Sequence, residues 1–331
     1  AAAVVLAVTA LPMGVFAAKK DSTEEKLTKV TLNEVAHSIF YAPQYVAIEE
    51  GYFAEKGLDL TLVTGFGADK TMTAVISGEA DIGFMGAEAS VYAYQEGATD
   101  PVVNFAQLTQ RAGNFLVARE EMPDFKWEDL KGEKVLGGRK GGMPEMVFEY
   151  ILKKNGIDPQ KDLTIDQSID FGSTAAAFTS DDSAAYTVEF EPSATILEKE
   201  GAGYVVASLG EASGYVPYTS YSTKASYMKE NPEIIQKFTD ALQKGMDYVQ
   251  NHTPEEIAEV IAPQFKETDL ETITAIVKRY YDQDTWKENL IFEKDSFELL
   301  QDILEDAGEL TDRTAYENLV QTEYAQKACK N

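Results

Sequence analysis

The sequence predicts an α/β protein with mixed, largely parallel sheets, flanking helices and a helical C-terminal region. Two observations support this fold class. Strand-like and helix-like segments alternate between residues 28 and 208, which is typical of a mostly parallel sheet. From Pro232 onward, apolar residues recur at helical spacing, as in Ile234, Phe238 and Leu242. With 331 residues, 44% of them hydrophobic, the chain is long enough to form two α/β lobes.

The alternation begins with apolar and polar residues taking turns over 29–36, which predicts a strand. The helix that follows the next loop is expected to end at Gly57, because glycine is a common helix stop. The elements expected up to residue 118 are strand 29–36, helix 45–56, strand 58–64, helix 69–77, strand 80–85, helix 88–95 and strands 102–109 and 114–118.

A second unit is expected from about Gly113. A short strand at 134–136 runs into a glycine-rich turn, and Pro144 suits a first helical position because proline has no N–H to leave unpaired there. That helix is expected to end at Gly156. The further elements expected in this unit are strands 163–169 and 184–190, helix 192–200 and strand 204–208.

Composition narrows the function classes. The formal net charge is −27, so the surface cannot easily supply the basic face that nucleic-acid binding needs. Cys329 is the only cysteine, and His37 and His252 are the only histidines, which argues against thiolate metal sites and zinc chemistry. We therefore expect no cofactor, no nucleic-acid partner and a monomer.

Residues 1–18 are almost wholly apolar and give way to Lys19 and Lys20. This pattern predicts the apolar part of a secretory signal, with cleavage after Ala17. A short, uncleaved membrane anchor is the alternative. Either way, the protein is expected to be exported, and to be periplasmic or associated with the cell surface.

Four segments resemble the type II periplasmic binding proteins of ABC importers, in the branch that binds thiamine pyrimidine precursors, nitrate, sulfonates and taurine. The likeness covers roughly residues 28–248. The segments are FYAPQYVAIEEGYFAEKGLDL (40–60), MTAVISGEADIGF (72–84), the glycine-rich turn and helix at 137–155, and FEPSA (190–194).

The resemblance implies two lobes that close around a small molecule, with an ABC permease as the membrane partner. The chain would cross between the lobes near 111–114 and 214–218. Lobe one would comprise 28–112 and 216–331, and lobe two 113–215. Many relatives in single-membrane bacteria carry a lipid-attachment cysteine just after the signal; no cysteine stands at that place here, so a lipid anchor is not expected.

The loop after the first strand is the first candidate ligand site, because open α/β sheets bind ligands at the carboxyl ends of strands. Its aromatic rings can stack on a flat ligand, while its hydroxyl and amide groups can orient that ligand. Phe40 could equally be a core residue, and His37 a structural histidine. The candidate contacts in this loop are His37, Ser38, Phe40, Tyr41 and Gln44.

Two further strand-to-helix junctions of lobe one are expected to face the cleft. Backbone N–H groups at a helix start can bind a carboxylate or phosphate. Asp69 is interpreted as a helix cap. Glu88 is interpreted as a first-turn acid that favours the helix dipole, and contact with the ligand is its alternative role. The candidate contacts at these junctions are Phe66, Gly67, Met85 and Gly86.

Lobe two adds a glycine-rich turn in which Arg139 could bind an anionic group, with Gly141, Gly142 and Met143 at the start of the helix. The turn lacks the spacing of a nucleotide P-loop. At the end of a strand, Glu191 is expected to accept hydrogen bonds from an amine or amino-pyrimidine. Its alternative role is at the start of a helix. Tyr218, at the second crossing, is expected to line the cleft.

These residues favour an amino-pyrimidine or related aromatic heterocycle as the ligand. A small oxyanion such as a sulfonate or nitrate is the alternative. A pyrimidine-synthesis enzyme on the same fold is less favoured, because the related cytoplasmic enzymes carry a cysteine-rich motif that is missing here and only His37 could serve them. A ligand-reading domain of a sensor is the third alternative.

Overall fold

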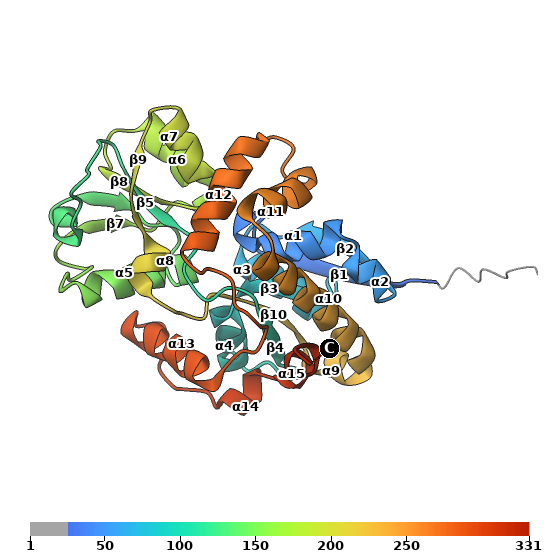
Figure 1. Ribbon diagram of the computed structural model, residues 1–331. Helices are drawn as coiled ribbons and strands as arrows, with labels where there is room; N and C mark the ends of the chain where they lie inside the picture. The colour runs from blue at the N-terminus through green and yellow to red at the C-terminus, as the bar shows by residue number, and fades with distance from the viewer. Residues whose placement is uncertain (1–25, 331) are drawn as a thin grey trace, which may run out of the picture.

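Two five-stranded mixed sheets form the two halves of the molecule (Figure 1). The computed structural model describes residues 26–330, so the predicted signal segment lies outside it. The first sheet has the order β2–β1–β3–β10–β4, with β10 antiparallel to both of its neighbours. Its strands are β1 Thr28–Glu34, β2 Leu58–Thr64, β3 Ile82–Gly86, β4 Val102–Gln107 and β10 Thr219–Lys224.

The second sheet has the order β7–β6–β8–β5–β9, and β5 is antiparallel to β8 and β9. Its strands are β5 Phe115–Ala118, β6 Lys134–Leu136, β7 Thr164–Asp166, β8 Tyr186–Glu189 and β9 Tyr204–Ser208. The chain crosses between the sheets twice, from β4 to β5 and from β9 to β10. The mixed α/β class with flanking helices is thus confirmed.

Helices connect the strands and form the C-terminal region. Those before β10 are η1 Ile39–Tyr41, α1 Ala42–Glu49, α2 Tyr52–Glu55, α3 Ala68–Ser77, α4 Glu88–Gln95, η2 Trp127–Leu130, α5 Met143–Lys154, α6 Phe171–Ser180, α7 Ser193–Lys199 and α8 Leu209–Ser213. Those after β10 are α9 Ala225–Glu230, α10 Pro232–Asn251, α11 Pro254–Ile261, η3 Ala262–Gln264, α12 Leu270–Asp282, α13 Lys294–Asp306, α14 Tyr316–Leu319 and α15 Glu323–Ala328.

The C-terminal helices contact both halves. Figure 1 shows α12 between the helices of the second half and those of the first. The hydroxyl of Tyr280 on α12 donates to the carbonyl of Gly113 in the first crossing, at 2.7 Å. Lys153 of α5 pairs with Asp306 of α13 at 3.1 Å. The predicted helical C-terminal region therefore also connects the two halves.

Several boundaries differ from the prediction for local reasons. The helix expected at 45–56 begins earlier, because Pro43 occupies its first turn, and it is split at Gly51, which has a φ of +74°. Strand β10 and helix α6 were not predicted. The sequence of β10, TSYSTK, is too rich in small polar residues to show an apolar period. In α6, FGSTAAAFTS, the residues between the two phenylalanines are all small, so the helical spacing is only weakly marked.

The contact between α1 and α10 depends on Gly245. A Cβ there would lie 2.3 Å from the carbonyl oxygen of Pro43 and 3.1 Å from the Cβ of Ala47. We expect Gly245→Ala to lower the free energy of unfolding by about 1–3 kcal/mol, because the helices would have to separate. Urea unfolding measures this change.

The matched control is Gly172→Ala in α6, where a Cβ meets nothing within 4 Å. There alanine should raise the free energy of unfolding by up to ~1 kcal/mol through its better helix propensity. Equal effects of the two substitutions would contradict this account of the α1–α10 contact.

Candidate functional site

The two halves meet where strands of both sheets end. After β1, the hydroxyl of Ser38 donates to the backbone carbonyl of Glu191 beyond β8, at 3.0 Å. On α4, after β3, the hydroxyl of Tyr92 donates to the carbonyl of Gly141 in the glycine-rich turn, at 2.9 Å. These contacts join the loops at the carboxyl ends of β1, β3, β6 and β8. We call this junction the interlobe seam.

The β1 loop is held in place by one buried carboxylate. Glu34 is fully buried at the end of β1. Its Oε2 accepts hydrogen bonds from Gln44 Nε2 and the Tyr45 hydroxyl, both at 2.8 Å. Its Oε1 accepts from the Thr64 hydroxyl at 3.0 Å and lies 2.8 Å from His37 Nδ1. A buried carboxylate needs such donors, so the loop and α1 are drawn in around it.

Aromatic rings line the seam around Phe40, which is fully buried. The Phe40 ring centroid lies 5.0 Å from that of Tyr41 and 5.6 Å, edge-on, from that of Tyr218. Phe190 of the second half lies 6.0 Å away. Gly113 of the first crossing packs so closely that a Cβ there would lie 2.5 Å from the Phe40 ring. Rings from both halves are thus packed together at this part of the seam.

Several buried polar atoms near these rings lack a hydrogen-bond partner among the described residues. They are Glu88 Oε2, the Tyr218 hydroxyl and both side-chain polar atoms of Asn114. All three side chains are at most 3% exposed. Such atoms are rare in folded proteins, since leaving a buried polar group unpaired costs about 1–3 kcal/mol. Asn114 directly follows Gly113, and Tyr218 touches Phe40, so the unpaired groups border the aromatic part of the seam.

Glu88 is the first residue of α4, and its carboxyl group reaches the start of α5 in the other half. Its Oε1 accepts a hydrogen bond from the backbone N–H of Met143 at 3.3 Å. Its Oε2 folds over Gly86, where a Cβ would lie only 2.1 Å away. Burial raises the pKa of Glu88 to about 7, against the opposing influence of the backbone N–H groups of Glu88 and Met143 and of Arg139. The carboxyl group thus reaches the other half of the molecule, in addition to favouring the dipole of its own helix.

Some predicted residues make their contacts within the first half and not across the seam. Both ring nitrogens of His37 are engaged, by Glu34 and by the carbonyl of Gln264 at 2.9 Å, and its ring stacks on Phe265. Gln44 is fully buried and donates to Glu34. Both residues support the loop from behind, which is the structural role that the sequence left open for His37.

Two other predicted contacts point elsewhere. Met85 packs with Met72 and Val75 in a separate apolar cluster on the other side of the first sheet. Phe66 is 76% exposed and has a φ of +57°, and Gly67 beside it precedes α3. Among the described residues, the rings around Phe40 contact other rings and not Phe66, and Met85 packs in its own separate cluster. The structure therefore groups neither Met85 nor Phe66 with the interlobe seam.

The glycine-rich turn closes one side of the seam. Met143 is 1% exposed and is the first residue of α5, and Gly142 is its N-cap. Arg139 is about half exposed, and its nearest acidic partner is Asp69 of the first half, at 3.9 Å. Arg139 thus lies at the rim, while the buried start of α5 is occupied by Glu88.

Glu191 is buried, but its carboxylate is already bound. It accepts from the Thr195 backbone N–H at 3.0 Å, the Thr195 hydroxyl at 2.9 Å and Arg279 Nη1 at 2.7 Å. Arg279 also pairs with Glu198 at 3.1 Å. The helix-start role of Glu191 therefore describes its contacts, and its ion pair with α12 clamps the halves together. Of the three residues with unpaired groups at the seam, Tyr218 was a predicted contact, whereas Glu88 and Asn114 were not.

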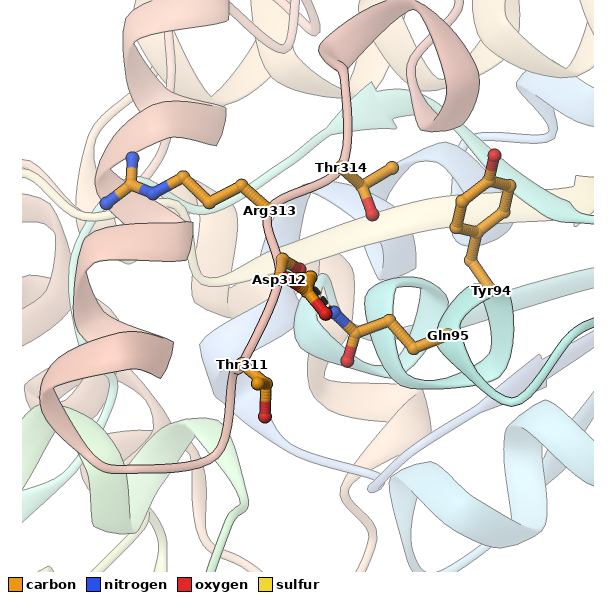
Figure 2. A pocket seen from close by; sticks show the side chains of 6 residues that line it. All are labelled: Tyr94, Gln95, Thr311, Asp312, Arg313 and Thr314. Carbon is orange, nitrogen blue, oxygen red and sulfur yellow. Dashed lines mark hydrogen bonds between the residues drawn. The ribbon is translucent and has the colours of Figure 1, made fainter.

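Two surface hollows lie apart from the seam. One, of about 490 Å³, is shown in Figure 2, where Gln95 of α4 donates to the backbone carbonyl of Asp312 at 2.6 Å. The other, of about 500 Å³, includes Gln110 and Tyr215 beside the crossings. The unpaired atoms of Glu88, Tyr218 and Asn114 line neither hollow. The residues that line the first are Tyr94, Gln95, Thr311, Asp312, Arg313 and Thr314.

Comparisons with known proteins agree with this architecture. "Putative binding protein YtlA" of Bacillus subtilis is 47% identical over 312 residues, covering 94% of this chain and 93% of that protein. Riboflavin-binding protein RibY of Chloroflexus aurantiacus is 25% identical, over 70% of this chain and 65% of its own. The 4-amino-5-hydroxymethyl-2-methylpyrimidine phosphate synthase THI11 of Saccharomyces cerevisiae is 24% identical over 63% of each chain.

Among solved structures, the alkanesulfonate-binding protein SsuA of Xanthomonas axonopodis pv. citri, bound to MOPS, aligns with a TM-score of 0.71. It is 15% identical and covers 89% of this chain and 98% of its own. The nitrate-binding protein NrtA of Synechocystis PCC 6803 aligns with a TM-score of 0.72 at 15% identity, over 92% of this chain and 89% of its own. The NMT1/THI5-like family matches residues 39–257. The chain therefore belongs to the NMT1/THI5-like family and has the periplasmic binding protein fold.

Proposed function

We propose that this protein captures a small solute between its two halves and delivers it to an ABC permease. The observation that carries the proposal is the set of buried, unpaired polar atoms at the interlobe seam. A solute bound there would satisfy Glu88, Asn114 and Tyr218 and would contact both halves, so it would favour the closed arrangement. Family membership and the likeness to YtlA support the class of a solute-binding protein.

The favoured ligand is an amino-pyrimidine or a related aromatic heterocycle. Phe40 and Tyr218 offer rings for stacking, and Asn114 offers a donor and an acceptor side by side. Glu88 offers an acceptor for an amino group, which is the role that the sequence suggested for Glu191. The names of RibY and THI11 refer to a flavin and a pyrimidine, which agrees with a flat heterocycle.

A small oxyanion is the alternative ligand. The structural likeness to SsuA and NrtA supports it, as does Arg139 at the rim. An enzyme like THI11 is the alternative activity. The contacts of His37 disfavour the enzyme, because both of its ring nitrogens are already engaged within the first half.

Export is part of the proposal. Its support is the apolar segment at residues 1–18, which lies outside the described residues, together with the fold of the importer-associated relatives. Within residues 26–330, helices long and apolar enough to cross a bilayer are absent.

Tyr218→Phe tests the proposal directly. The substitution deletes one buried hydroxyl that has no partner in the described residues. We expect the ligand-free protein to unfold at the same or a higher temperature, because no hydrogen bond is lost and an unpaired polar group is removed. Affinity for the ligand should fall about fivefold or more, since a neutral hydrogen bond contributes on the order of 1 kcal/mol.

The ligand itself is sought by thermal shift with pyrimidines, flavins, sulfonates, nitrate and polyamines, because a ligand that binds only the folded form raises its melting temperature. Calorimetry then compares the wild type with Tyr218→Phe. Equal affinities of the two proteins would remove Tyr218 from the site. A strong response to a sulfonate with none to any heterocycle would overturn the ligand class.

Affinity should also depend on pH. Burial raises the pKa of Glu88 to about 7, and an amino-group donor binds the ionised form better. The groups facing Glu88 are Tyr41, Tyr92, Tyr218 and Arg139; burial raises the pKa of each tyrosine further, so all three stay neutral between pH 6 and 8. For a heterocycle that does not itself titrate in this range, affinity should rise up to about tenfold from pH 6 to 8.

Calorimetry at several pH values measures this dependence, and Glu88→Gln should remove most of it. Affinity that falls as pH rises would contradict a donor ligand, because an oxyanion needs Glu88 to be protonated.

A further inference from the structure

We infer that Glu88 is a built-in anion that makes the closed site select against oxyanions. The inference deepens the proposed function, on which it rests, by naming a specificity-determining residue. It begins with geometry. The start of a helix attracts anions through its free N–H groups and its dipole, and α5 is 12 residues long. The Met143 N–H at that start already donates to Glu88 Oε1.

The second step concerns the other carboxyl oxygen. Glu88 is 3% exposed, and its Oε2 has no partner among the described residues. Glu88 therefore fills the anion position of α5 with one oxygen and presents the other, unpaired, at the seam. A bound sulfonate or nitrate would bring a second negative charge to the same buried place, where repulsion is poorly screened. A ligand with an N–H donor would instead pair with Oε2.

The third step is the placement of the nearest cation. Arg139 is about half exposed at the rim and lies 3.9 Å from Asp69. It opposes the rise in the pKa of Glu88, but no ion pair joins it to Glu88 among the described residues. The charge that could neutralise an incoming anion is thus already shared with acidic groups of this chain. The glycine-rich turn, whose sequence suggested anion binding, instead contacts Asp69 and Glu88 of the first half.

The test compares two ligand classes on matched variants. Wild-type protein, Glu88→Gln and the control Glu323→Gln are titrated calorimetrically at pH 8, above the pKa of Glu88, with the best heterocycle from the thermal-shift panel and with MOPS, nitrate and sulfate. Glu323→Gln removes one negative charge from an exposed side chain on α15 and leaves Arg139, Asp69 and the start of α5 unchanged.

We expect Glu88→Gln to lose about tenfold or more in heterocycle affinity, because a hydrogen bond to a charged group is lost, and to gain about tenfold or more for at least one oxyanion. The heterocycle-to-anion ratio of Glu323→Gln should stay within about twofold of the wild type. An unchanged ratio in Glu88→Gln would overturn the inference, and so would tight oxyanion binding by the wild type.

A second variant covers the case in which Glu88→Gln does not fold. Gly86→Ala keeps the carboxyl group, but its Cβ would lie 2.1 Å from Oε2 and so would displace Glu88 from α5. It should shift the ratio in the same direction, and an unshifted ratio would count against the inference. If no heterocycle binds any variant while the oxyanion gain appears, the role of Glu88 stands and the proposed ligand class fails.

Discussion

The buried carboxylate of Glu34 is the constraint on which the first half of the molecule depends. A carboxyl group in the core is costly unless hydrogen-bond partners surround it, and Glu34 has partners from three segments: the β1 loop, α1 and the end of β2. That requirement fixes the path of residues 35–44. The path in turn places Ser38 and Phe40 against the second half, so the position of these seam residues depends on the contacts of a core carboxyl group.

The second buried carboxyl group, that of Glu88, has fewer hydrogen-bond partners than that of Glu34. Glu88 has one satisfied oxygen and one unpaired oxygen, and the second lies where both halves and the aromatic rings meet. In a chain of net charge −27, a further anion at this place would be opposed both locally and by the overall field. The two carboxyl groups therefore have different roles. Glu34 holds the β1 loop in place, and Glu88 determines the charge of the ligand that can bind beside this loop.

Much of the fold could be predicted from the sequence because most strands carry local periods. Strand β2 and helix α4 occur at the predicted residues, and most other elements differ by only a few residues. Strand β10 escaped prediction because its partners, β3 and β4, come from distant parts of the chain, and its Thr and Ser residues become buried only through that pairing.

The sequence by itself determined the class of fold, the family and the loops from which a site could be built, because apolar period, glycine position and motif order are local properties. Only the tertiary structure decided which side chains of those loops face one another. His37, Gln44 and Glu191 carry suitable groups but use them within the protein. Glu88, Asn114 and Tyr218 retain unpaired ones. The difference lies in hydrogen-bond partners that come from distant segments, and no local pattern records them.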